Sequence, residues 1–287
     1  MLYLFFVSLL WAFSFGLIKG GLTDLPSSSV AFVRLFIAFA VFVPFLRFRD
    51  LRPGDAAKLL LTGAVQYGLM YVTYMQAFQH LQAYEVALFT VFTPIYVTII
   101  NDLFVKRLCP ISMSAVILAV AGGIIIKYQE LGSSELLRGF LLMQGANLCF
   151  AFGQIFYRRI MARLPNQPAD LQVFGLLYLG AALTAALATI GSDWSAFELT
   201  SKQAGSLLYL GVVASGLGFF LWNIGARRVS AGALAVFNNL KIPLGILVSV
   251  LVFGETTDWA RLLIGGALMA AALFINARRP LPNGGEE

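Results

Sequence analysis

Charged residues, cysteine and histidine are all scarce in this chain of 287 residues. Only 12% of the residues are charged, whereas a soluble globular domain carries roughly a quarter. Two cysteines, one in a basic loop and one in an apolar segment, and a single histidine predict neither a disulfide nor a metal site. The phosphate-binding pattern G-x-x-x-x-G-K-[ST] is absent as well. We therefore expect no cofactor and no ATP hydrolysis by this chain.

Long apolar runs make up most of the chain. Hydrophobic residues make up 59% of the chain, and the mean hydropathy is +0.83. The runs are ~17–23 residues long and continuous, which suits helices that cross a bilayer and not the alternating strands of a barrel. The sequence predicts an all-α integral membrane protein with ten transmembrane helices, near residues 2–20, 29–46, 57–79, 84–105, 111–127, 137–157, 171–191, 204–226, 231–253 and 261–277.

Basic residues are unevenly divided between the two ends of these runs. With the N-terminus in the cytoplasm, thirteen of the 20 lysines and arginines fall on the cytoplasmic side and five on the other, while Arg34 and Lys241 lie within runs. The positive-inside rule therefore predicts that both termini are cytoplasmic. Because the net charge of +6 then belongs to loops, the lipid bilayer is the expected partner and nucleic acid is not. The sequence does not distinguish a monomer from a homodimer.

The two halves of the chain resemble each other at an offset of 148 residues. At this offset Gly63, Gly68 and Leu69 fall on Gly211, Gly216 and Leu217. Each half holds five predicted spans, an odd number, so the second half must be inverted relative to the first. Inverted repeats are typical of alternating-access transporters. We predict two five-helix repeats, residues 1–130 and 131–279, followed by a disordered cytoplasmic tail at residues 280–287.

Charged side chains within the runs are the first candidates for a binding site. A charge at the centre of a span costs ~2.5–3.5 kcal/mol on insertion scales, so it needs a partner or a function. Lys241 follows Asn238 and Asn239 near the middle of the ninth run, where it can bind a carboxylate or pair with an internal acid. Arg34 can pair with Glu85, either as a structural ion pair or as an outer gate that a substrate carboxylate opens.

Aromatic and amide side chains at similar depth form a second group of candidates. Tyr67, Tyr71 and Tyr74 follow helical spacing and share one face of the third run. Aromatic walls with a few amides suit a largely apolar ligand that carries a few hydrogen-bonding groups. The candidate substrate-binding residues of this kind are Trp11, Gln66, Tyr67, Tyr71, Gln144, Asn147 and Trp222.

Several short motifs resemble the EamA family of the drug/metabolite transporter superfamily. They are LWAFSF at residues 10–15, the arginine of the second run, VASG at residues 213–216 leading to Trp222-Asn223, and Gly254-Glu255. Within that family, LFTVFTPIY at residues 88–96 and the Asn-Asn pair before Lys241 are similar to the bacterial biotin transporter branch. That branch is often grouped with carboxylate, amino-acid and amine transporters.

The resemblance implies a transporter in the bacterial inner membrane, with inverted repeats around a central cavity and no use of ATP. Its expected activity is uptake of a small organic anion, biotin first, by alternating access. The carboxylate of biotin would meet Lys241 or Arg34, and its rings would lie on Trp11 or the tyrosines. Its ureido group would meet amides such as Asn239, Asn147 or Gln144.

Two alternatives remain open at this point. One is export of amino acids or other amphipathic metabolites, because charge distribution sets orientation and not the direction of transport. The other, from a different class, is an integral membrane enzyme that acts on lipid. Such an enzyme would be expected to cluster His, Asp or Glu at one membrane face, and here the acids are scattered while His80 is alone.

Overall fold

A computed structural model describes residues 2–47, 51–104, 106, 114, 117–118, 120–122, 124–125, 133–164, 168–228, 231–256 and 258–277. Within this part of the chain every regular element is a helix. The predicted run at 111–127 lies largely outside the described residues, and the predicted tail at 280–287 lies wholly outside them. The all-α prediction is confirmed for the part described.

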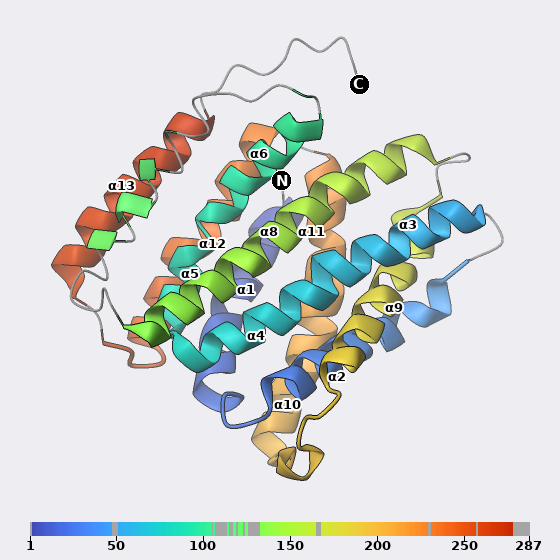
Figure 1. Cartoon of the computed structure of the whole chain (residues 1–287), viewed down its shortest axis with the longest axis horizontal. Coiled ribbons are helices and arrows are strands. Elements are labelled where there is room, and N and C mark those ends of the chain that lie inside the picture. Colours follow the sequence, from blue (N-terminus) through green and yellow to red (C-terminus); the bar gives the residue numbers. More distant parts are fainter. Residues whose placement is uncertain are drawn as a thin grey trace.

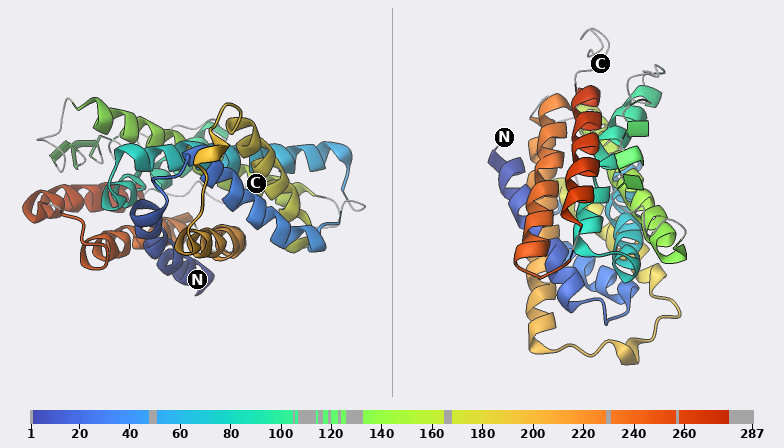
Figure 2. Two further views of the ribbon diagram at one scale, coloured as in Figure 1. Left: turned by 90° about the horizontal axis from the view of Figure 1, so that it is seen from below. Right: turned by 90° about the vertical axis from the view of Figure 1, so that its left-hand side faces the viewer.

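The helices pack side by side in one bundle, in which α4 and α8 run obliquely to α11 (Figures 1 and 2). In chain order they are α1 (Leu2–Gly21), α2 (Ser27–Phe42), η1 (Val43–Phe45), α3 (Pro53–Gly63), η2 (Ala64–Leu69), α4 (Met70–His80), α5 (Ala83–Phe89), α6 (Phe92–Phe104), α8 (Ser134–Arg163), α9 (Asp170–Ala188), η4 (Trp194–Ala196), α10 (Ser201–Tyr209), η5 (Leu210–Leu217), α11 (Gly218–Arg227), α12 (Ala231–Leu251) and α13 (Trp259–Ala277).

Six helical segments of the described chain are long and apolar enough to cross a membrane. They are Leu2–Gly21, Ser27–Phe45, Ala83–Phe104, Ser134–Arg163, Asp170–Ala188 and Ser201–Arg227. Large apolar side chains such as Leu61, Leu187, Ile190 and Leu263 are exposed on the outside of the bundle. An apolar exterior on long apolar helices identifies a multi-pass membrane protein.

The predicted run at 84–105 is not one unbroken helix. Helix α5 ends at Phe89, and α6 begins at Phe92. Pro94 has no backbone N–H, so it cannot donate to the carbonyl of Thr90, which a continuous helix would require. The break leaves Thr90 at the C-cap of α5 and places Thr93 in the first turn of α6.

Two long helices each contain a π-helical segment. In the helix that spans α3 and α4 this segment is η2, and in the helix that spans α10 and α11 it is η5. The offset of 148 residues between the halves carries residues 64–69 onto 212–217, which lie within η5. A π-helical turn shifts the hydrogen-bond register and is often found at functional sites.

Small residues let two of these helices approach at backbone distance. A Cβ atom at Gly63 would lie 1.8 Å from the carbonyl oxygen of Leu177, and one at Gly180 would lie 2.0 Å from the carbonyl oxygen of Leu60. The two glycines belong to α3 and α9, so each helix presents a glycine to the backbone of the other. Close approach through small residues is a main source of helix association in lipid.

We predict that Gly63→Ala lowers the melting temperature of the detergent-solubilised protein by several degrees, because the new methyl group forces α3 away from α9. The matched control is Gly205→Ala in α10, where no neighbouring atom lies within 4 Å of the added carbon. That control should leave the melting temperature unchanged or raise it, since alanine favours a helix over glycine by about 1 kcal/mol. Equal melting temperatures for both variants would contradict this account of the packing.

Candidate functional site

A cavity lies inside the bundle, between α1, α2, α4, α8, α11, α12 and the break between α5 and α6. It holds roughly 560 Å³ of space not filled by atoms, open solvent at its mouth included. Its lining is Trp11, Ser14, Phe15, Arg34, Met70, Tyr71, Tyr74, Thr90, Thr93, Met143, Ala146, Asn147, Phe150, Phe219 and Lys241. Of the predicted site residues, the structure places Trp11, Arg34, Tyr71, Asn147 and Lys241 around this one space.

Lys241 is a buried cation with aromatic neighbours. Its side chain is 5% exposed, and its Nζ lies 5.2 Å from the ring centroid of Trp11 and 5.8 Å from that of Phe150. Within the part of the chain that the structure describes, Lys241 has no ion pair and donates no hydrogen bond. Aromatic faces attract an ammonium group, but only weakly compared with a carboxylate.

Arg34 is the second buried cation, and it is held from two other helices. Its Nη2 donates to the hydroxyl of Tyr71 at 3.0 Å and to that of Ser215 at 3.1 Å, and the two hydroxyls lie 2.8 Å apart. Its Nη1 contacts the Met75 sulfur at 3.6 Å. The guanidinium is therefore fixed in place while its buried Nε–H has no acceptor.

The predicted pairing of Arg34 with Glu85 is wrong. One Glu85 oxygen accepts the backbone N–H of Gln82 at 2.7 Å and so caps the start of α5. Glu255 reaches the same turn and accepts the N–H groups of Ala83 at 2.8 Å and Tyr84 at 2.9 Å. The N–H groups of a first helical turn have no partners within the helix, so they attract carboxylates. Glu85 caps a helix at this position and does not line the cavity.

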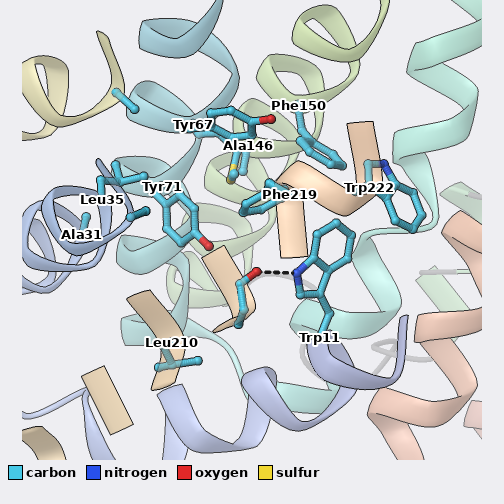
Figure 3. Close-up of a cluster of buried hydrophobic side chains, with 14 of the residues drawn as sticks. Trp11, Ala31, Leu35, Tyr67, Tyr71, Ala146, Phe150, Leu210, Phe219 and Trp222 are labelled. Carbon is cyan, nitrogen blue, oxygen red and sulfur yellow. Dashed lines mark hydrogen bonds between the residues drawn. The ribbon is translucent and has the colours of Figure 1, made fainter. Parts of the chain in front are cut away.

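Trp11 links the cavity to the π-helical segment η5. Its ring nitrogen donates to the carbonyl oxygen of Ala214 at 2.9 Å, the dashed line in Figure 3. Its ring lies 4.8 Å from those of Phe219 and Trp222, centroid to centroid, and 6.0 Å from that of Phe150. The indole ring of Trp11 therefore lines the cavity, while its N–H is occupied by the backbone carbonyl oxygen of Ala214.

Three predicted site residues lie together in a buried layer beside the cavity and not in its lining. Asn223 donates to the hydroxyl of Tyr67 at 2.6 Å, and Gln66 donates to the side-chain oxygen of Asn223 at 3.4 Å. Trp222 donates to Gln154 at 3.2 Å. These bonds join η2 and α8 to α11, so Gln66, Tyr67 and Trp222 hold helices together at this point.

The predicted amides of Gln144 and Asn238 also lie outside the lining. Gln144 accepts a hydrogen bond from the Tyr96 hydroxyl at 3.0 Å. Asn238 is buried, and neither its amide nitrogen nor its amide oxygen has a hydrogen-bond partner. The side chain of Asn239 lies outside the described residues.

Three hydroxyl groups that line the cavity, those of Ser14, Thr90 and Thr93, are not among the residues predicted from the sequence. Each stands in an apolar run, where single hydroxyls are common and carry little signal. Two of them lie within the motif LFTVFTPIY, where the proline after Thr93 marks a helix break. Among the described residues there is no cluster of His, Cys, Asp and Glu placed to hold a metal ion.

The profile of the EamA-like transporter family matches this chain twice, over residues 1–128 and 137–277. A probable biotin transporter of Pseudomonas aeruginosa is 40% identical over 278 residues, which cover 96% of this chain and 97% of that protein. The biotin transporter of Escherichia coli K12 is 36% identical over 285 residues, covering 98% and 94%. A probable amino-acid metabolite efflux pump of Salmonella typhimurium is 27% identical, covering 94% and 92%.

A crystal structure of a protein that is 20% identical has the same overall fold. The two superimpose with a TM-score of 0.68, and the match covers 97% of this chain and 98% of the other. At this level of identity the likeness concerns the fold alone.

The charge of the cavity predicts how a cysteine placed in it will react. The test variant is Ala146→Cys in a background with Cys109 and Cys149 changed to serine. We expect its thiol to react at least about tenfold faster with an anionic methanethiosulfonate than with a cationic one. The reason is that a cleft lined by charges of one sign concentrates ions of the opposite sign. The rates are measured on detergent-solubilised protein and divided by those of a free thiol. Adding Lys241→Met should reduce the preference, whereas adding Lys202→Met, at an exposed lysine, should not. Equal rates for the two reagents would contradict a positive cavity.

Proposed function

The chain belongs to the EamA-like transporter family, and from this premise we propose that it takes up biotin across the bacterial inner membrane by alternating access, without ATP. The relatives at 36–40% identity over nearly the whole chain, whose names refer to biotin transport, support the choice of substrate. The cavity supports it on chemical grounds. Biotin has one carboxylate, a largely apolar body and a small polar ring system, and the cavity offers two cations among aromatic walls.

The observation that carries the proposal is that two buried cations face one cavity, and no carboxylate of the described residues pairs with either. A buried charge without a partner is costly, and the cost is removed when a ligand brings the opposite charge. Lys241 makes no hydrogen bond and is the primary seat for the carboxylate. Arg34 has an Nε–H without an acceptor and adds a second positive charge to the same space.

The proposed architecture is ten spans in two inverted five-helix repeats, residues 1–130 and 131–279, with both termini in the cytoplasm. Three findings support it. The family profile matches two separate stretches, one in each half. The π-helical segments η2 and η5 occur at positions that the repeat offset relates. The start of α1 and the end of α13 lie at the same end of the bundle (Figure 2), as an even number of spans requires.

Export of amino acids is the weaker alternative. The relative that supports it is 27% identical, and an amino acid carries an ammonium group as well as a carboxylate. Among the described lining residues none is acidic, so the ammonium group would have only neutral oxygens as acceptors and would share the cavity with two cations. A lipid-modifying enzyme is weaker still, since the family consists of transporters and the described residues contain no cluster of catalytic acids and histidines around the cavity.

We expect bacteria that lack their own biotin transporter to accumulate labelled biotin when they express this chain. Lys241→Ala should reduce the initial rate by at least about tenfold, because a hydrogen bond to a charged group contributes ~1.5–3 kcal/mol. The matched control is Lys202→Ala, at an exposed lysine of α10, which should transport normally. Membrane abundance of each variant is measured by immunoblot.

The same assay can overturn either part of the proposal. No accumulation by the unmodified chain, despite normal insertion, would overturn biotin uptake. Normal uptake by Lys241→Ala would overturn the carboxylate seat and leave the substrate standing. Biotin methyl ester provides a further check, because without the carboxylate it should compete poorly with labelled biotin for the unmodified chain.

A further inference from the structure

Two hydroxyl groups of the cavity lining, those of Ser14 and Thr90, have already used their only hydrogen. The Ser14 hydroxyl donates to the carbonyl oxygen of Leu10 at 2.9 Å, and the Thr90 hydroxyl donates to that of Ala87 at 2.7 Å. A carbonyl oxygen has no hydrogen to give, so the direction of both bonds is fixed. Each hydroxyl therefore presents only lone pairs to any ligand in the cavity.

Thr93 and Asn147 provide two further acceptors in the lining. The Asn147 amide nitrogen donates to the carbonyl oxygen of Phe89 at 2.8 Å, which fixes the orientation of the amide. Its oxygen accepts the hydroxyl hydrogen of Thr93 at 3.0 Å. The second amide hydrogen of Asn147 points to Gln144 at 3.4 Å. Neither Thr93 nor Asn147 has a hydrogen left to donate, while the oxygens of both retain lone pairs.

The two cations of the lining, together with the hydroxyls of Tyr71 in the lining and Ser215 behind it, have the opposite character. The Lys241 ammonium has donors without acceptors, and Arg34 has an Nε–H without an acceptor. The hydroxyls of Tyr71 and Ser215 bond to each other and both accept from Arg34, so one of their two hydrogens is also left over. The lining is thus divided into a donor group and an acceptor group.

We propose that Ser14, Thr90, Thr93 and the Asn147 oxygen form an acceptor site that recognises N–H groups of the substrate. This inference rests on the proposed function, in which the donor group receives the carboxylate. In biotin the two N–H groups of the cyclic urea are the matching donors. The acceptor site then determines specificity, because a ligand that presents an oxygen there meets lone pairs and leaves buried polar atoms unpaired.

The test compares biotin with its cyclic-carbamate analogue, in which an oxygen atom replaces one ureido N–H. This exchange turns a donor into an acceptor with little change of shape. Competition against labelled biotin should show that the unmodified chain binds biotin about tenfold or more tightly than the analogue. Thr90→Val and Thr93→Val keep the side-chain shape and remove the hydroxyl. Each should raise the KM for biotin about two- to tenfold and shrink the preference for biotin over the analogue.

The ratio of the affinities for biotin and for the carbamate analogue distinguishes a loss of recognition from a general effect on structure. Loss of packing weakens both ligands equally, whereas loss of an acceptor weakens biotin more than the analogue. The matched control is Thr62→Val, because the Thr62 hydroxyl is buried and donates to the Lys58 carbonyl oxygen at 2.7 Å, away from the cavity. This control should leave the preference unchanged.

The outcomes distinguish this inference from the proposed function. If the unmodified chain takes up biotin but does not prefer it over the carbamate, the acceptor site is overturned and biotin uptake stands. If Thr90→Val and Thr93→Val both keep the full preference, the assignment of these residues is overturned. If the unmodified chain takes up no biotin, the proposed function fails and this inference fails with it.

Discussion

Backbone hydrogen bonding within the bilayer is the constraint on which the cavity depends. Lipid offers no partner to a carbonyl or an N–H, so the protein must supply one wherever a helix breaks or changes register. At η5 the Trp11 ring nitrogen bonds the Ala214 carbonyl, and the Tyr178 hydroxyl bonds those of Ser215 and Gly216. At the end of α5 the Thr90 hydroxyl bonds the Ala87 carbonyl. The side chains that donate to these backbone carbonyl oxygens have no hydrogen left for a substrate. Backbone hydrogen bonding thus determines which side-chain donors of the cavity remain available.

Arg34 and Lys241 are the charged side chains of the lining, and no carboxylate of the described residues pairs with either. Cation–π contacts return ~0.5–2 kcal/mol, which falls short of the cost of removing a lysine from water. A purely structural role would be served better by an uncharged side chain of similar volume, because well-packed apolar groups replace buried charges without loss. The retained charges are consistent with a site whose missing partner arrives with the substrate. Much of the binding free energy would then come from pairing a buried charge whose desolvation already destabilises the folded protein.

The sequence was sufficient to predict an all-helical membrane protein and five of the residues that line its cavity, Trp11, Arg34, Tyr71, Asn147 and Lys241. Apolar runs fix where a helix lies along the membrane normal, and an intramembrane charge such as Lys241 is conspicuous in such a run. Rotation about the helix axis is harder to predict. Gln66 and Tyr67 lie at the depth of the cavity, but they belong to η2, whose π-helical turn changes which side chains face inward. A constant helical period assigned Tyr67 and Tyr71 to one face, whereas only Tyr71 reaches the cavity.

The error over Glu85 has a related cause. Opposite charges at similar depth suggest a pair, but a carboxylate in a first helical turn has a nearer partner in the unpaired N–H groups of its own backbone. Sequence distance alone does not reveal that Glu255, from the far end of the chain, also bonds this turn.

The two π-helical segments occupy related positions but serve different purposes. Segment η2 directs Gln66 and Tyr67 toward Asn223 and closes a buried layer, whereas η5 directs Ser215 toward Arg34 and so supports the donor group of the cavity. A symmetric pair of repeats would offer the same groups from both sides. Biotin is not symmetric, since a carboxylate and N–H donors stand on different parts of the molecule. The proposed two-repeat scaffold would therefore need unlike side chains at equivalent positions to separate donors from acceptors. Tyr67 and Ser215, which the offset of 148 residues relates, are one such pair.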